Sequence, residues 1–263
     1  MEALPIAHID ARRDAGWSSE AIVVLERAVE YHGGWARWRA LRTVSFVVER
    51  LWGFLPWMKG LGRTFPLPRR ISVFPHQQRT VFDAYPREGS RGVFDRGSVR
   101  IESARDGMAL EASIDHRRTF RGFSKDRRWC PLDALYFFGY ALWHYHTLPF
   151  SLREGRFMRL RRTGPKSDGG CALDIELPPS LPTHCSRQTF HFDAAGCLRR
   201  HDYTADIVGF WARGAHHWMD YRVAAGMCFA ARRRVVPRAF GATLPMTALG
   251  GLLDDFSVEL DEP

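Results

Sequence analysis

The spacing of apolar residues predicts that the chain starts with helices. Ile22, Leu25 and Val29 recur at helical intervals and would lie on one face of a helix. A serine pair precedes them in the N-cap position, and a pair of glycines follows where the helix would stop. A second helical segment, WARWRALR, comes next. Residues 1–41 are therefore expected to form an N-terminal helical segment.

From Thr43 onward, the period of the apolar residues changes from the helical to the strand value. Short runs rich in Val, Ile and Phe are bounded by Pro, Gly or Asp, which predicts antiparallel strands. The turn from Asp193 to Gly196 lies between two such runs and predicts a hairpin. The pattern gives about eleven strands, and a sheet of that size must curl or close.

The stretch LDALYFFGYALWHYHTLPF, residues 132–150, interrupts the strands with apolar and aromatic residues that do not alternate. Asp133 would complement a helix dipole and Pro149 would end the helix, so a helix over 131–149 is predicted. A curved sheet must cover its concave face, and this helix and the N-terminal one can do so. The predicted fold class is α+β: a single half-barrel domain over 1–263, in which a large curved antiparallel sheet wraps around one or two helices, with 131–149 on its concave face.

The charge pattern argues against a nucleic-acid partner. The chain has 38 basic and 29 acidic residues, a net charge of +9, but the basic residues are nearly all arginine. They are spread along the whole chain, whereas a nucleic-acid-binding surface concentrates its charge on one element. Nucleic acid is therefore not an expected partner. A weak contact with an anionic membrane surface stays an alternative.

Cysteine usage and missing motifs restrict the other partners. The five cysteines are odd in number and widely spaced, which indicates neither a disulfide framework nor a zinc ribbon. The start MEALPIAHIDARRDAG has no apolar run of the kind that a secretory signal needs, and no uncharged stretch is long enough for a membrane span. We expect a soluble, cytoplasmic protein. The patterns GxGxxG and GxxxxGK are absent, so no cofactor is predicted.

Three segments resemble a known family. YHGGWARWRALRTVSF resembles the opening of the half-barrel proteins of the bacterial lipoprotein-carrier superfamily, the LolA/LolB-like fold, and GCLRRHDY and DYRVAAGMCFAARRRVVPR resemble later strands of it. The resemblance implies a half-barrel fold. Its carriers have an export signal and lack the aromatic helix expected at 131–149. It therefore implies a cytoplasmic relative that handles an apolar molecule other than a lipoprotein.

Aromatic residues concentrate in 52–68 and 132–150. The first segment, WGFLPWMKGLGRTFPLP, is expected to be a long loop suited to act as a lid, and the second has polar tips on an apolar helix, as in a ligand-lined pocket. The alternative is a core helix whose polar tips satisfy backbone groups. The first hypothesis is a soluble binding protein for an apolar or aromatic small molecule in a half-barrel cavity. The predicted ligand-binding residues are Trp52, Phe54, Trp57, Tyr136, Tyr140, Trp143, His146 and Trp218.

The second hypothesis is a cofactor-independent enzyme, an acid–base isomerase, cyclase or hydrolase acting on a hydrophobic substrate. Histidine titrates near neutral pH, and the runs RRHDYTAD and HHWMDYR would bring histidines and tyrosines to the concave face if they pair as neighbours. His144 and His146 lie about 200° apart on a helix and cannot share a metal ion, so no metal site is predicted. The predicted catalytic residues are His201, Tyr203, His217 and His144.

Overall fold

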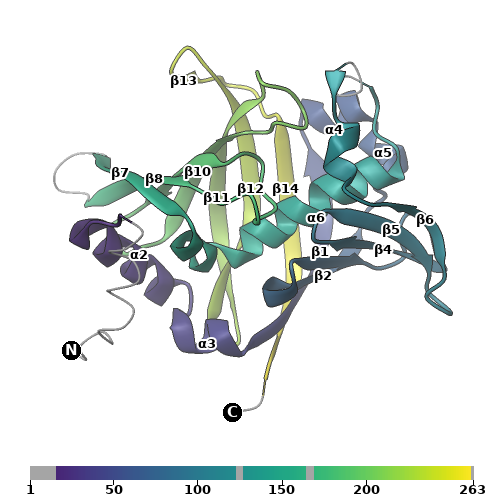
Figure 1. The fold of residues 1–263 in the computed structure, drawn as a ribbon, viewed down its shortest axis with the longest axis horizontal. Helices are drawn as coiled ribbons and strands as arrows, with labels where there is room; N and C mark the ends of the chain where they lie inside the picture. The colour runs from purple at the N-terminus through teal and green to yellow at the C-terminus, as the bar shows by residue number, and fades with distance from the viewer. Residues whose placement is uncertain (1–15, 123–126, 164–168, 262–263) are drawn as a thin grey trace.

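The computed structural model describes residues 16–122, 127–163 and 169–261. Its main feature is a sheet of 14 strands, in which neighbouring strands run antiparallel. The sheet curves around one long helix, α6, as Figure 1 shows. The helices are α2 (Ser19–Tyr31), α3 (Gly34–Ala40), α4 (Phe54–Lys59), α5 (Leu61–Thr64) and α6 (Pro131–Thr147), and the 3-10 helices are η1 (Pro75–Gln77), η2 (His116–Thr119) and η4 (Phe150–Glu154). The strands are β1 (Leu41–Trp52), β2 (Arg69–Phe74), β3 (Arg79–Phe82), β4 (Ser90–Asp95), β5 (Ser98–Ser103), β6 (Ala109–Ser113), β7 (Arg156–Thr163), β8 (Gly170–Glu176), β9 (Arg187–Phe192), β10 (Leu198–Thr204), β11 (Arg213–Ala224), β12 (Met227–Ala239), β13 (Ala242–Thr243) and β14 (Leu249–Leu260).

The order of the strands makes the sheet an open half-barrel. It runs β6-β5-β4-β3-β2-β1-β14-β12-β11-β10-β9-β8-β7, and β13 pairs with β12 alone. The end strands β6 and β7 are not paired with each other, so the sheet does not close. The C-terminal strand β14 lies between β1 and β12 and joins the two halves of the chain. The predicted fold class, a large curved antiparallel sheet around a helix, is confirmed.

Two local predictions need correction. The sheet has 14 strands rather than about eleven. Part of the difference is the run RGVFDRGSVRIES, which forms the two strands β4 and β5 because Arg96 and Gly97 turn the chain at positive φ, and part is the short β13. The segment 52–68, predicted as a long loop, contains α4 and α5. Gly60 adopts the left-handed conformation between them, with a φ of 71°, and so ends one helix and starts the next.

Helix α6 is buried along its whole length, from Leu132 to Thr147, because the sheet curves around it. A helix that is apolar on all sides is stable only when protein encloses it. It lies close to the sheet at Gly139, where a Cβ atom would lie 2.4 Å from Cβ of Phe94 on β4. Thr80 on β3 donates a hydrogen bond to the carbonyl of Gly139 at 3.0 Å. Because glycine has no Cβ, Gly139 allows this short distance between the helix and the sheet.

Asp133 fixes the start of α6. Its Oδ2 accepts a hydrogen bond from the backbone N–H of Cys130 at 2.8 Å, and its Oδ1 accepts from His116 Nε2 at 3.0 Å and from Arg127 at 2.9 Å. Burial alone would raise the pKa of this carboxyl group, but the hydrogen bonds from His116, Arg127 and Cys130 outweigh it and lower the pKa to about 2. The buried carboxylate is thus ionised at neutral pH and complements the helix dipole.

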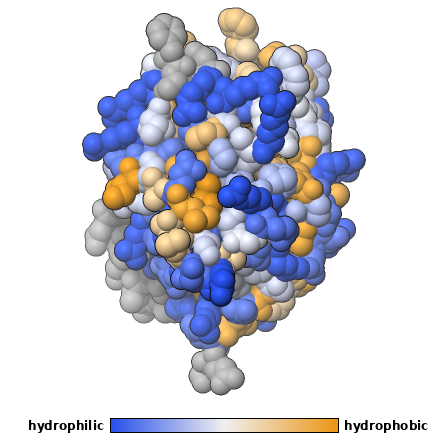
Figure 2. Space-filling view, turned by 90° about the vertical axis from the view of Figure 1, so that its right-hand side faces the viewer, coloured by the Kyte–Doolittle hydropathy of each residue, from blue (hydrophilic) through white to orange (hydrophobic). Residues whose placement is uncertain are grey.

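The sheet leaves one edge strand uncovered. Figure 2 shows apolar side chains gathered in small patches among charged ones on the side of the molecule that carries α4, α5 and β4 to β6. Met108, Leu110 and Ile114, in and beside β6, are exposed apolar residues. β6 is only five residues long, and short edge strands limit pairing with other chains.

Candidate functional site

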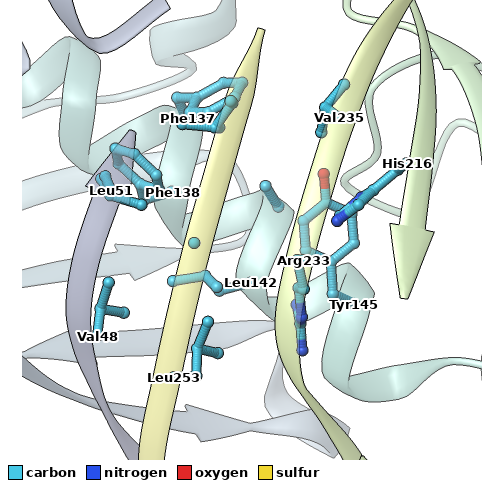
Figure 3. A pocket seen from close by; sticks show the side chains of 13 residues that line it. Val48, Leu51, Phe137, Phe138, Leu142, Tyr145, His216, Arg233, Val235 and Leu253 are labelled. Atoms are coloured by element: carbon cyan, nitrogen blue, oxygen red, sulfur yellow. The ribbon is translucent and has the colours of Figure 1, made fainter. Parts of the chain in front are cut away.

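An apolar pocket lies between α6 and the middle of the sheet. We call it the inner pocket; its enclosed cavity measures about 50 Å³, and the space between the surrounding atoms is about 500 Å³ when the part open to solvent is included. One wall is formed by α6 and the other by β1, β14, β12 and β11 (Figure 3). The lining residues are Val48, Leu51, Phe137, Phe138, Ala141, Leu142, Tyr145, His216, Arg233, Val235, Leu249, Gly251 and Leu253.

A second pocket continues the first toward the surface. This outer pocket encloses a cavity of about 70 Å³, or about 550 Å³ with the part open to solvent, and shares Phe137, Val235 and Leu249 with the inner pocket. Phe54 of α4 lies on one side of it, and the loop between β10 and β11 lies on another. That loop contributes Trp211, which is 51% exposed, so the outer pocket reaches the molecular surface there. The two pockets together form one apolar trough.

Three polar side chains meet at one side of the inner pocket. Figure 3 shows Arg233, Tyr145 and His216 there, across the pocket from Val48 and Leu51. All three are buried. A buried apolar pocket with a few convergent polar groups is the usual form of a small-molecule site.

The register of β11 and β12 turns Arg233 inward. It lies opposite Trp218, which faces the concave side, while the neighbours Arg232 and Arg234 point to the other face. Arg232 reaches Asp220 at 3.9 Å, and Arg234 donates to Thr247 Oγ1 at 2.9 Å. The triplet RRR therefore places one guanidinium inside the half-barrel and two outside it.

A chain of tyrosine and histidine side chains runs beside the trough. Tyr140 Oη lies 2.8 Å from Nδ1 of His184, and Tyr145 Oη lies 2.5 Å from its Nε2, so one ring nitrogen donates and the other accepts. The hydroxyls of Tyr145 and Tyr203 are 3.2 Å apart. Tyr145 borders the inner pocket and Tyr203 the outer pocket. The chain thus presents two phenol groups to the trough.

Two further histidines share a buried glutamine. Nε2 of His144 lies 3.1 Å from Oε1 of Gln188, and Nε2 of His201 also bonds to this oxygen. Because one carbonyl oxygen accepts both contacts, each ring donates from Nε2. Burial lowers the pKa of His144 to about 4, and burial, followed by the nearby histidines, lowers the pKa of His201 well below its usual value. Both rings are held uncharged at neutral pH.

One predicted catalytic residue lies on the wrong face. β10 and β11 do pair as neighbours, as expected, but His201 is opposite His216 and Arg200 is opposite His217. His217 therefore points to the convex side and does not join His201 and Tyr203. The inward histidine of the HH pair is His216. The sequence alone does not fix which of two adjacent residues faces inward.

Asp220 interrupts the pairing of β11 with β12. It has a φ of 52°, and the ladder lacks a pair at this position, between Met219 opposite Arg232 and Tyr221 opposite Ala230. The register is the same on both sides of this gap, so neither strand contains an extra residue. Beyond it, Tyr221 packs against Tyr31 of the N-terminal helix and donates to the Leu198 carbonyl at 2.6 Å.

The predicted ligand-binding residues are dispersed. Phe54 lines the outer pocket, and Trp218 packs under Arg233. Among the others, Trp57 is exposed at the surface, and Trp143 donates to the Pro75 carbonyl and borders a cleft elsewhere. Trp52, Tyr136, Tyr140 and His146 also lie outside the walls of the trough. The aromatic faces of α6 at Phe137, Phe138 and Tyr145 line it instead.

Sequence reasoning missed the residue that dominates the polar end of the trough, Arg233. The triplet RRR at 232–234 indicated it, because the middle of three consecutive strand residues must point away from its two neighbours. His184 was also missed, because it follows the loop of prolines before β9 and no periodicity marks it. Its place depends on tertiary contacts, namely the hydrogen bonds with Tyr140 and Tyr145 of α6 and the stacking on Tyr203 of β10.

The part of the chain that the structure describes has neither a cluster of metal ligands nor a helix that could span a membrane. Across residues 16–122, 127–163 and 169–261, no group of three or more His, Cys, Asp or Glu side chains has the geometry to hold a metal ion. Over the same part of the chain, no helix combines the length and the apolar character that crossing a membrane requires.

Comparisons with known proteins found similarity in structure only. No family model matches the sequence, and the search of the curated proteins found no match. Among solved structures, the chain is similar to a LolA superfamily protein from Nitrosomonas europaea, with 9% identity and a TM-score of 0.49 over 92% of this chain and 94% of that one. It is also similar to a DUF1329 family protein from Desulfovibrio piger, with 11% identity and a TM-score of 0.47 over the same shares of the two chains. At these identities the likeness concerns the arrangement of the chain alone.

Proposed function

We propose that the protein binds an apolar small molecule in the trough between α6 and the sheet. The observation that carries this proposal is the inner pocket, whose wall is apolar except for Arg233, His216 and Tyr145. Removing apolar ligand surface from water contributes about 25 cal/mol per Å². A ligand that fills this space would therefore gain most of its affinity from Leu142, Leu253 and similar side chains.

The second candidate, acid–base catalysis, has one observation in its favour. Tyr145 lines the inner pocket, and its hydroxyl bonds to a histidine, as a catalytic acid would. General acid–base groups work best when their pKa lies near the working pH. Here burial raises the pKa of Tyr145, and burial also lowers the pKa of its partner His184 well below neutral. These shifts favour binding over proton transfer.

Filling the inner pocket tests the proposal. Gly251 on β14 lines this pocket, and a Cβ there would lie 3.5 Å from Leu51 and 3.7 Å from Leu253, in ordinary contact. Gly251→Leu should therefore fold and occupy the ligand space. Ala112→Leu on β6 is the matched control, since it adds a leucine to an exposed strand position.

The readout is the fluorescence of a neutral naphthylamine dye that brightens in apolar surroundings. We expect the wild type and Ala112→Leu to bind the dye with equal dissociation constants, and Gly251→Leu to bind it at least tenfold more weakly. Equal binding by all three proteins, each shown to be folded by circular dichroism, would disprove binding in the inner pocket.

A further inference from the structure

The guanidinium of Arg233 is buried without an anionic partner. The side chain is 5% exposed. Its Nε donates to the Ala230 carbonyl at 3.3 Å, one terminal nitrogen donates to His146 Nε2 at 3.3 Å, and the other terminal nitrogen has no hydrogen-bond partner in the described structure. These acceptors are neutral. The positive charge is therefore uncompensated by any of its hydrogen bonds.

Aromatic rings provide the rest of the environment. Cζ of Arg233 lies 4.7 Å from the ring centre of Trp218 and 5.2 Å from that of Tyr145. Cation–π contacts stabilise a charge only in part. Burial lowers the pKa of Arg233 to about 10, and the groups that oppose this shift are tyrosines. The side chain nevertheless remains a cation at neutral pH.

Isolated buried charges are costly, and proteins normally pair them. Asp133 bonds to Arg127 and His116, and Glu102 bonds to Arg100. Buried Arg69 donates instead to the backbone carbonyls of Pro66, Asp83 and Ala84. Arg233 differs from all of these, because one terminal nitrogen has no acceptor in the described structure and the side chain lies in the wall of the inner pocket.

A second unsatisfied group lies beside it. His216 lines the same pocket and is 2% exposed, and its Nδ1 has no hydrogen-bond partner in the described structure. The Tyr145 hydroxyl completes a set of three polar groups around one end of an apolar space. Opposite them, the wall is formed by aliphatic side chains such as Val48 and Leu51.

We infer that the ligand of the trough is an amphiphile with an apolar chain and an acidic head group, whose anion pairs with Arg233. This inference rests on the proposed function and names its ligand class. The chain would lie along α6 toward Trp211, where the trough reaches the surface, and the head group would accept hydrogen bonds from Arg233 and His216. A single-chain carboxylate fits this description, and so does a single-chain phosphate ester.

The test compares three probes that share one twelve-carbon chain: dodecanoic acid, dodecan-1-ol and dodecyl phosphate. Dissociation constants are measured by calorimetry at pH 8, below the concentrations at which the probes aggregate. A hydrogen bond to a charged group raises the binding affinity of a ligand about ten- to hundredfold. We expect at least one of the two anions to bind tenfold or more tightly than the alcohol, and the tighter anion identifies the head group.

Arg233→Met is the decisive variant, and Arg232→Met on the outer face is its matched control. Arg233→Met should keep the alcohol affinity and lose the preference for the anion, whereas Arg232→Met should keep both. If the wild type binds acid, phosphate and alcohol equally, the inference is overturned while the proposed function stands. If none of the three probes binds, the proposed function fails as well. Should Arg233→Met not fold, the wild-type comparison of anion and alcohol still decides the question.

Discussion

Arg233 and Trp218 face each other across β12 and β11, with the guanidinium carbon 4.7 Å from the ring centre. This contact places an uncompensated charge at the polar end of an otherwise apolar trough. It connects the fold to the proposed ligand, because the half-barrel supplies the apolar wall and one inward residue of a basic triplet supplies the charge.

Removing this charge should stabilise the ligand-free protein. Replacing buried ionic groups by apolar residues of similar volume is often stabilising by about 1–4 kcal/mol. Arg233→Met should therefore raise the free energy of unfolding by about 1 kcal/mol or more, measured by urea denaturation. Arg232→Met, at an exposed site, should change it by less than about 0.5 kcal/mol. A lower stability of Arg233→Met would mean that the guanidinium is satisfied in the folded state.

Close packing of α6 makes Gly139 sensitive to substitution. A Cβ at this position would lie 2.4 Å from Phe94. Overpacking of this kind costs about 1–3 kcal/mol, so Gly139→Ala should lower the unfolding free energy by that amount. Gly62 on α5 has open space around it, and Gly62→Ala serves as the control. A Gly139→Ala variant as stable as the wild type would show that the helix does not touch the sheet here.

Asp133 should determine part of the acid stability. Its folded pKa of about 2 lies below the unfolded value near 3.9, so its contribution is complete above pH ~4 and is lost as the pH falls toward 2. Asp133→Asn should lower the unfolding free energy at pH 7 by about 2 kcal/mol, since it weakens bonds to Arg127 and His116. Thermal unfolding at pH 7 measures this loss. Wild-type stability in the variant would exclude a structural role for the carboxylate.

The buried histidines should destabilise the fold in mild acid. His144 has a folded pKa of about 4, whereas the unfolded chain takes up its proton near pH 6.5. The unfolded state therefore binds more protons between these values, and the free energy of unfolding must fall as the pH drops from about 6.5 to 4. Each such histidine contributes about 1.4 kcal/mol per pH unit. The other buried rings with lowered pKa values are His32, His146, His184, His201 and His216.

Urea unfolding at pH 7, 6 and 5 measures this dependence, and His144→Gln isolates one contribution. The variant should show a smaller loss of stability between pH 6 and 5 than the wild type, by about 1 kcal/mol. A wild-type stability that is flat over this range would contradict the burial of neutral histidines.

The alternation of apolar residues was sufficient to predict the curved sheet, and the lack of alternation in 132–150 was sufficient to predict α6. Local patterns could not give the place of β14 between β1 and β12, because the pairing of β14 with β1 joins residues about 200 positions apart. They also could not show that the pairing of β11 with β12 is interrupted at Asp220. Which histidine of HH and which arginine of RRR faces the trough depends on such details of register.

Native mass spectrometry of the protein with dodecanoic acid tests most directly whether the trough is a binding site. The structure predicts a one-to-one complex with the wild type and with Ala112→Leu, and a largely empty Gly251→Leu. A Gly251→Leu protein that binds dodecanoic acid as fully as the wild type would contradict binding in the inner pocket, because the added side chain occupies that space.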